Sequence, residues 1–173
     1  MAGSAGFAVL SPASAVNAAG GANYDPKVGG AAAVALGYHF NSWISAQAGL
    51  DWNRHRTIFN QLRGSNFSST ERDQTVQTIF VDALLYFRNR NDRFRPYLSA
   101  GPALVTFPQA GADRHELGLK VTVGIDVRIK DQWSFRYSFH ETMSANPLAA
   151  SLQPPSPARL MNFQNLFGIV RSF

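Results

Sequence analysis

The chain has 173 residues, enough for one domain, with a formal net charge of +5 and no cysteine. The lack of cysteine excludes disulfides and thiolate metal sites, and no run approaches the about 18 apolar residues of a membrane-spanning helix. The basic residues are spread over expected strand ends and turns instead of forming one run, which argues against a nucleic-acid partner.

The first third of the chain predicts two strands and a turn between them. Residues 6–16 form the weaker strand, because Pro12 lacks the backbone N–H that a strand ladder uses. Residues 18–27 combine paired glycines with Asp-Pro, which indicates a turn. Residues 29–40 alternate large apolar side chains with small or polar ones, and residues 41–42 make a very short turn.

Two longer strands follow, with a loop between them. Residues 43–58 alternate apolar side chains with polar ones or glycine, which predicts a strand. Residues 60–74 are polar, hydroxyl-rich and of mixed charge, so we expect a long loop. Residues 75–88 predict the next strand, although Phe80 and Leu84 interrupt its polar face.

The fifth strand is rich in small residues. A short basic turn, residues 89–94, leads into this strand at residues 95–107. Pro102 lies inside it and predicts a β-bulge, since proline cannot donate a ladder hydrogen bond. Residues 108–115 predict a loop.

The clearest strand is residues 117–130, where every odd position is aliphatic and every even position is glycine, a hydroxyl residue or a charge. Only the period of two in a strand separates the two kinds of side chain so cleanly. The segment is longer than the about 5–6 residues of a typical strand. It fits a tilted strand crossing a hydrocarbon layer, which needs about 9–11 residues. Residues 131–132 make another two-residue turn.

The last third repeats this pattern. Residues 133–143 alternate aromatic with polar side chains, residues 146–159 form a proline-rich loop, and residues 160–173 predict a final strand. The sum is about eight antiparallel strands, with short links alternating with long ones, as in membrane barrels. The expected fold is therefore all-β: a transmembrane up-and-down antiparallel β-barrel formed by residues 1–173 as a single domain.

Alternation alone does not say which face is buried, because a soluble lipocalin-like barrel shows the same period with its apolar face inward. Here the polar face mixes charges of both signs with small residues, which suits a narrow, packed lumen. Aromatic residues also gather at strand ends, as they do at membrane interfaces: Tyr38, Phe40, Trp43, Phe87, Trp133 and Phe173. We therefore expect the apolar face to contact lipid.

Three segments carry a resemblance to a known family: residues 37–40 (GYHF), 95–101 (RPYLSAG) and 167–173 (FGIVRSF). They resemble the eight-stranded outer-membrane β-barrels of Gram-negative bacteria, the group that includes the OmpA transmembrane domain and OmpX-like proteins. The resemblance implies a small porin-like monomer in the bacterial outer membrane, with long loops extracellular and both termini periplasmic. It implies outer-membrane lipids and lipopolysaccharide as partners, and recognition of Phe173 as the signal for the barrel assembly machinery.

Residues 1–4, MAGS, lack the charged region and apolar core of an export signal. Since an outer-membrane protein must be exported, we expect that an artificial start at residues 1–4 has replaced the signal. The resemblance does not specify an activity, because one fold hosts many functions. The expected function is a structural or surface-interaction role; the alternatives are a narrow pore for small solutes and a lipid A-modifying hydrolase.

Ionisable residues on the polar face are the first candidate site. Single buried charges cost several kcal/mol each, so they should pair across the lumen. The predicted network comprises Asp51, Asp82, Lys120, Asp126, Arg128, Arg136 and His140, with His55 and Arg88 as further candidates. Because about eight strands leave room only for side chains, we expect a closed lumen; a polar path for ions is the alternative.

His140 is the second candidate. Residues 137–146 faintly resemble outer-membrane lipid A deacylases, which pair a histidine and a serine two residues apart on the lipid side of a strand. In this chain Thr142 follows His140 by two residues and Ser144 by four, and His140 lies on the polar face. A histidine that hydrogen-bonds inside the lumen is therefore the preferred interpretation, and we expect no enzymatic activity.

A basic rim is the third candidate. It comprises Arg54, Arg56, Arg63 and Arg72 near the loop expected at 60–74, with Arg114 and Arg159 on other loops. Arginine pairs well with phosphate, so we expect contact with lipopolysaccharide; an ordinary solvated loop surface is the alternative. The sequence contains no metal-ligand spacing, Gly-rich phosphate loop or nucleophile elbow, and we expect no cofactor and no metal.

Overall fold

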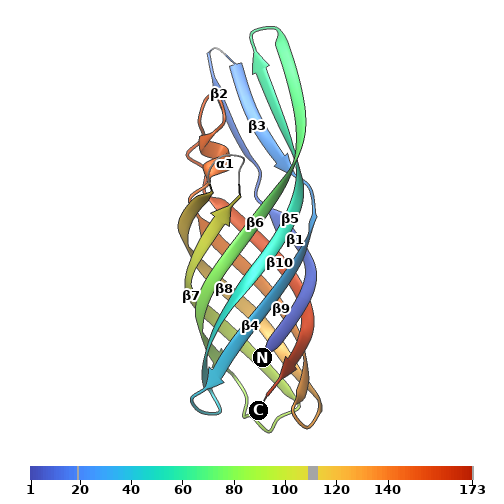
Figure 1. Cartoon of the computed structure of the whole chain (residues 1–173). Helices are drawn as coiled ribbons and strands as arrows, with labels where there is room; N and C mark the ends of the chain where they lie inside the picture. The colour runs from blue at the N-terminus through green and yellow to red at the C-terminus, as the bar shows by residue number, and fades with distance from the viewer. Residues whose placement is uncertain (19, 109–112, 173) are drawn as a thin grey trace.

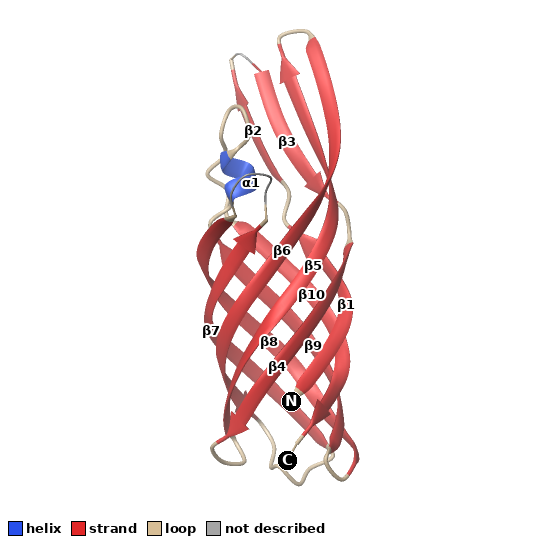
Figure 2. Cartoon of the chain, in the orientation of Figure 1, coloured by secondary structure: helices blue, strands red, loops and turns tan. Residues whose placement is uncertain are grey.

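The computed structural model describes residues 1–18, 20–108 and 113–172, and this part of the chain is almost entirely β-sheet (Figure 2). It contains ten strands and one short helix. Their bounds are β1 Ala2–Leu10, β2 Ala13–Asn17, β3 Gly20–Pro26, β4 Gly29–His39, β5 Ile44–Arg63, β6 Asn66–Tyr86, β7 Phe94–Phe107, β8 Arg114–Lys130, β9 Trp133–Ser144, α1 Pro147–Ala150 and β10 Leu160–Arg171.

Eight of these strands close into a ring in the order β1, β4, β5, β6, β7, β8, β9, β10. Every neighbouring pair is antiparallel, and β1 closes the ring by pairing with β10 from Ala2 opposite Val170 to Leu10 opposite Asn162. The predicted up-and-down barrel is confirmed. The hairpin of β2 and β3 lies outside the ring and continues the sheet beside β5 (Figure 1).

The two ends of the barrel differ. At one end, called here the short-turn end, residues 40–43, 87–93 and 131–132 join the strands, and both chain termini lie toward it (Figure 1). At the other, the extended end, β2–β3 and the tips of β5 and β6 rise beyond the ring beside the segment 145–159. The short and the long connections therefore lie at opposite ends, as the sequence predicted.

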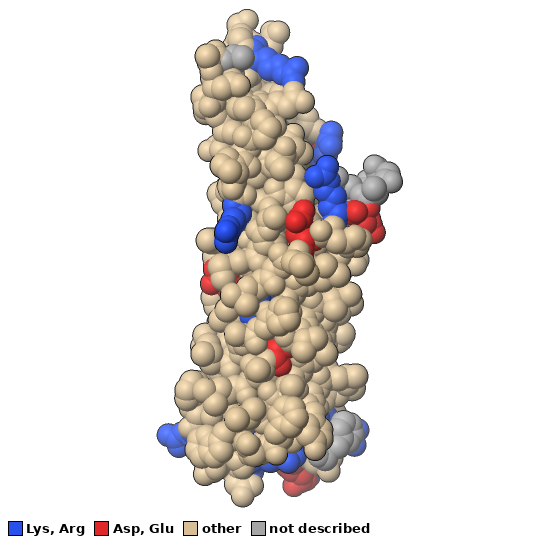
Figure 3. Space-filling model, turned by 90° about the vertical axis from the view of Figure 1, so that its left-hand side faces the viewer, with Lys and Arg blue, Asp and Glu red and all other residues tan. Residues whose placement is uncertain are grey.

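The barrel is apolar outside and polar inside. On β8, Leu117 is 82% exposed and Val123 56%, whereas Lys120, Thr122 and Asp126 are buried. The same division holds on β9, where Phe135 is exposed and Arg136 is buried. In Figure 3, charged side chains lie at the lower end and over the upper half of the molecule, and the band between them consists mostly of other residues. A lipocalin-like barrel, in which these apolar strand faces would point inward, is excluded.

Three predictions about the extended end were wrong. The strand expected at residues 6–16 is two strands, because the ladder breaks at Ser11 and Pro12, and β1 begins as early as Ala2. The expected turn at 18–27 contains β3, which pairs with β5. The expected loop at 60–74 is a regular hairpin that turns at Gly64, whose φ of +56° favours glycine. Apart from residues 6–10, which belong to β1, these segments lie beyond the ring, where alternation between lipid and lumen no longer applies.

The bulge predicted at Pro102 is absent from the β6–β7 ladder, which keeps one register on both sides of it: Phe80 lies opposite Ala103 and Ala83 opposite Ala100. Proline removes one hydrogen bond without adding a residue. Gly101 lets the strands approach closely, since a Cβ there would lie 1.8 Å from the Val81 carbonyl oxygen. Of the loop predicted at 108–115, residues 109–112 lie outside the described residues and β8 already begins at residue 114.

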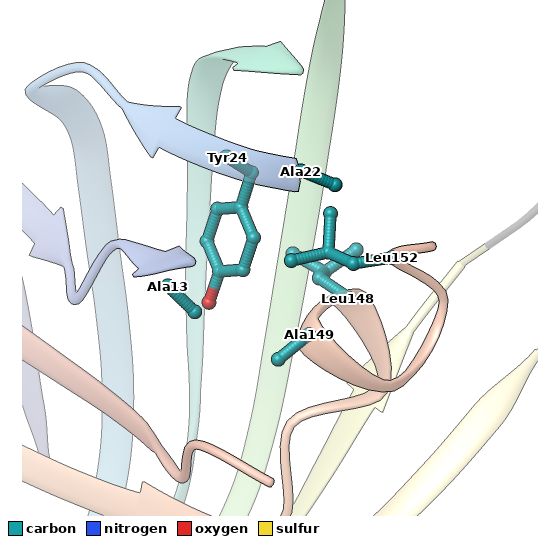
Figure 4. Packing of buried hydrophobic residues seen from close by; sticks show 6 residues of the cluster. All are labelled: Ala13, Ala22, Tyr24, Leu148, Ala149 and Leu152. Atoms are coloured by element: carbon teal, nitrogen blue, oxygen red, sulfur yellow. The ribbon is translucent and has the colours of Figure 1, made fainter. Parts of the chain in front are cut away.

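A small apolar cluster holds the 145–159 segment over the extended end (Figure 4). Its members are Ala13, Ala22, Tyr24, Leu148, Ala149 and Leu152. The Asn146 side chain caps α1 by accepting a hydrogen bond from the Ala149 amide at 3.0 Å, and its amide group donates to the Tyr24 hydroxyl. The predicted loop at 146–159 is thus confirmed in position, with one helical turn inside it. A second buried apolar cluster lies toward the same end of the barrel: Leu10, Val76, Val105, Phe107 and Leu160.

Candidate functional site

The first group of lumen charges centres on Asp51 of β5. The Lys120 ammonium, which β8 projects from the opposite wall, lies 2.9 Å from an Asp51 carboxylate oxygen, and both side chains are fully buried. The same ammonium lies 3.0 Å from the centre of the Phe80 ring, a cation–π contact that substitutes for part of its lost hydration. His140 Nδ1 lies 3.5 Å from the same Asp51 oxygen. The inward Phe80 that interrupted the sequence pattern therefore covers the lysine.

The second group lies nearer the short-turn end and centres on Arg136 of β9. Its guanidinium makes a bidentate contact with Asp126, with Nε–Oδ1 at 2.6 Å and Nη2–Oδ2 at 2.8 Å. Such paired bonds are among the strongest that side chains form. Arg136 also donates to the Tyr86 hydroxyl at 3.1 Å, and its guanidinium lies 4.7 Å from the Tyr97 ring centre. Two aromatic rings and an ion pair thus lie at one level of the lumen.

Gln47 connects Arg136 to a further acid, Asp82. Its amide nitrogen donates to Asp82 at 3.2 Å, and its amide oxygen accepts from Arg136 at 3.3 Å. Ser99 donates a second hydrogen bond to Asp82 at 3.3 Å. Gln47 and Ser99 were not predicted as site residues, because uncharged polar residues on a lumen-facing register carry no distinctive signal in the sequence.

The structure brings together Asp51, Asp82, Lys120, Asp126, Arg136 and His140. Three other candidates lie elsewhere. Arg128 donates to the main-chain carbonyls of Asn91 and Arg90 in a short turn. His55 contacts the Asn53 side chain at 2.9 Å, and Arg88 is exposed beyond the end of β6. Arg128 is on the inward-facing register of β8, as predicted, but it lies near the end of the strand, at the mouth of the barrel.

The lumen is filled closely around the ion pairs but not along its whole length. A Cβ at Gly124 would lie 2.5 Å from the Tyr97 ring, so glycine is needed where that ring crosses the lumen. A cavity of about 400 Å³ opens from the short-turn end and reaches Arg136, with His39 and Arg90 in its wall. Several buried lumen atoms make no hydrogen bond within the described residues; they belong to Thr78, Thr142, Asn162 and Gln164, among others.

The geometry does not support a hydrolase at His140. His140, Thr142 and Ser144 are all buried on the inner face of β9, whereas the lipid A deacylase arrangement needs its residues on the lipid side. The nearest acid, Asp51, is already engaged by Lys120. Among the described residues, no three His, Cys, Asp or Glu side chains are placed to hold a metal ion. No helix in the described ranges is long and apolar enough to cross a membrane.

The predicted basic rim is not one surface. Arg54 and Arg56 lie on the β5–β6 hairpin and pair across it with Asp73 at 2.6 Å and Glu71 at 2.7 Å. Arg63 donates to the Gln153 side chain. Arg72, on the same hairpin, and Arg159, beside the start of β10, are both exposed. The sequence did not show which of these arginines have partners and which do not.

Comparison with known proteins decides the family. Residues 2–153 match the description "Outer membrane protein beta-barrel domain". The chain belongs to that family. The structure of this outer-membrane barrel is similar to that of Neisserial surface protein A (NspA), with a TM-score of 0.58, 16% sequence identity, and coverage of 99% of this chain and 96% of that one. This likeness supports the fold.

A more distant solved structure is a mutant of the monoaromatic hydrocarbon channel TodX, with a TM-score of 0.30 and 11% identity over 91% of this chain and 56% of that one. A comparison with curated proteins finds no match. The predicted assembly signal, Phe173, lies outside the described residues, and recognition by the barrel assembly machinery stays a prediction.

Proposed function

We propose that this outer-membrane barrel has a structural or surface-interaction role without catalytic activity, and that its lumen is closed. The proposal rests on one observation: two groups of side chains, each built around an ion pair, lie across the lumen. Lys120–Asp51 and Arg136–Asp126 occupy two levels of the barrel and lie against the rings of Phe80 and Tyr97. An interior of eight strands is just wide enough for side chains, so two such levels leave little room for a solute.

The proposed orientation puts the extended end outside the cell and the short-turn end, with both termini, in the periplasm. It is supported by the general asymmetry of membrane barrels, which have short periplasmic turns and longer outer loops. In this orientation the β5–β6 hairpin carries the surface interactions. From Asn66 to Val76, β6 pairs with β5, and its ladder with β7 begins only at Gln77 among the described residues. The closed ring supports a monomer, since it leaves no strand edge within the barrel.

Single-channel recording in a planar bilayer tests the closed lumen. We expect no conductance steps from the folded protein in a neutral-pH buffer. A matched variant, Lys120→Ala combined with Asp51→Ala, removes one ion pair and shows whether the recording detects an opened lumen. Reproducible steps from the unmodified protein would contradict the proposal.

A narrow passage for small solutes is the second candidate, and the cavity that reaches Arg136 favours it. That cavity already spans part of the lumen from the short-turn end. Unpaired polar groups such as those of Asn162 and Gln164 mark a wettable stretch farther along. Conductance of the unmodified protein and of Arg136→Ala distinguishes the two functions. A passage gives a measurable conductance that rises in Arg136→Ala, whereas a closed barrel gives no conductance before the substitution.

A further inference from the structure

A groove lies at the extended end, between the start of β8, the end of β9 and the segment leading into β10. Its volume is about 690 Å³. Its wall includes the charged residues Arg114, Glu116 and Arg159, the apolar side chains of Leu117, Leu119 and Met143, and the buried polar residues Ser144, Asn146 and Ser156. This groove is separate from the lumen groups and from the β5–β6 hairpin.

The apolar wall continues the lipid-facing surface of the barrel. Leu117 is 82% exposed and Leu119 46%, and both lie on the same outward face of β8 as Val123. Met143 lies opposite Leu119 on β9. An acyl chain lying along this face can therefore extend into the groove without leaving an apolar surface, and its burial there is favourable.

The polar wall has two exposed guanidinium groups. Arg114 is the first residue of β8 and Arg159 immediately precedes β10, so both lie where the strands leave the ring. Within the described residues, neither makes an ion pair within 4 Å, in contrast to Arg54 and Arg56 of the hairpin. Guanidinium matches phosphate oxygens in geometry and charge. Glu116 shares the groove, so the site has two positive charges and one negative charge.

We propose that this groove binds a phosphorylated lipid of the surrounding leaflet. Arg114 and Arg159 contact its phosphate, and an acyl chain lies on Leu117, Leu119 and Met143. A soluble anion would use the arginines alone; the continuous apolar wall is what selects a lipid. The identity of the leaflet rests on the proposed orientation: with the extended end outside the cell, the ligand is a lipid of the lipid A type.

Native mass spectrometry of the folded protein in detergent tests the site with two probes, diphosphorylated lipid A and the same lipid without phosphates. We expect retention of the phosphorylated lipid only, and a loss of about tenfold or more in affinity for Arg114→Gln combined with Arg159→Gln, as expected for charge-assisted hydrogen bonds. Glu116→Gln should strengthen binding. The matched control is Arg88→Gln combined with Arg93→Gln, two exposed arginines at the short-turn end, which should bind as the parent does.

The apolar wall has its own control. Leu117→Asn should weaken binding, and Ile129→Asn, an equally outward substitution at the far end of β8, should not. Equal retention of both lipids, full binding by the double arginine variant, or displacement of the lipid by inorganic phosphate would overturn the proposal. The lipid site and the closed lumen can fail separately. A protein that does not conduct and binds no lipid contradicts only the lipid site. A protein that conducts and binds lipid contradicts only the closed lumen.

Discussion

The Lys120 ammonium and the Asp51 carboxylate lie 2.9 Å apart, and neither side chain is exposed to solvent. They come from β8 and β5, which are not neighbours in the ring. A buried charge without its partner is far more costly than a buried pair, so each of these residues depends on the other. This dependence ties opposite walls of the barrel together.

Lys120→Met should therefore destabilise the barrel by about 3–5 kcal/mol, because it leaves Asp51 buried without its cation. The combined variant Lys120→Met with Asp51→Leu removes both charges and should recover most of that loss. The free energy of unfolding in detergent, followed by the mobility shift of the folded barrel on gels, measures both. Equal losses in the single and double variants would show that the ion pair is not what couples these positions.

Gly124→Ala should destabilise the protein by about 1–3 kcal/mol, since the added methyl group overpacks the Tyr97 ring. Gly30→Ala is the matched control: it also lies in a strand, but a Cβ there meets no atom within 4 Å. That substitution should be neutral or slightly stabilising. The same unfolding measurement ranks the two variants, and the reverse order would contradict the described position of Tyr97.

The cluster around Tyr24 at the extended end should loosen in alkali. Burial raises the pKa of the Tyr24 phenol, and the hydrogen bond from Asn146 opposes that rise. A raised pKa in the folded state means that the neutral phenol contributes stability below its unfolded pKa of about 10. That contribution is lost as the pH rises through the folded pKa. A dye on Ser151→Cys should report greater mobility above about pH 10, and this change should disappear in Tyr24→Phe; an identical pH response in both would contradict it.

The orientation of the barrel can be tested with single cysteines, because the chain has none of its own. A membrane-impermeant thiol reagent applied to intact cells should label Ser65→Cys at the tip of the β5–β6 hairpin. It should label Asn91→Cys, in a turn at the short-turn end, only after the outer membrane is opened. The opposite pattern would place the extended end in the periplasm.

Much of the barrel could be predicted from the sequence because lipid and lumen impose opposite demands on alternate residues. Residues 117–130 show this most clearly: as far as residue 128 the odd positions are the more exposed and the even positions face inward, whereas Lys130, after a register shift in the β8–β9 ladder, is exposed. Beyond the ring no lipid imposes this demand: the tip of the β5–β6 hairpin is exposed on both faces, and β3 buries only Ala22, Tyr24 and Pro26 on one face. For that reason β3 resembled a turn, and the tips of β5 and β6 resembled a loop.

The lumen groups were predictable as a set but not as pairs. Register showed that Asp51, Lys120 and Arg136 point inward. Which charge meets which depends on the tilt and stagger of strands that are not sequence neighbours, and no local pattern encodes either. The same limit explains Arg128, whose inward register was visible but whose position at the mouth, beside the carbonyls of residues 90 and 91, was not.

The most direct test uses a fluorophore attached to one of two adjacent positions on β8. Brominated lipids then quench the fluorophore only if it is in contact with the bilayer. Val123→Cys lies on the exposed apolar face and Thr122→Cys on the buried polar face. We expect strong quenching at position 123 and little at position 122. Equal quenching, or stronger quenching at position 122, would contradict an apolar outer face around a polar, closed lumen.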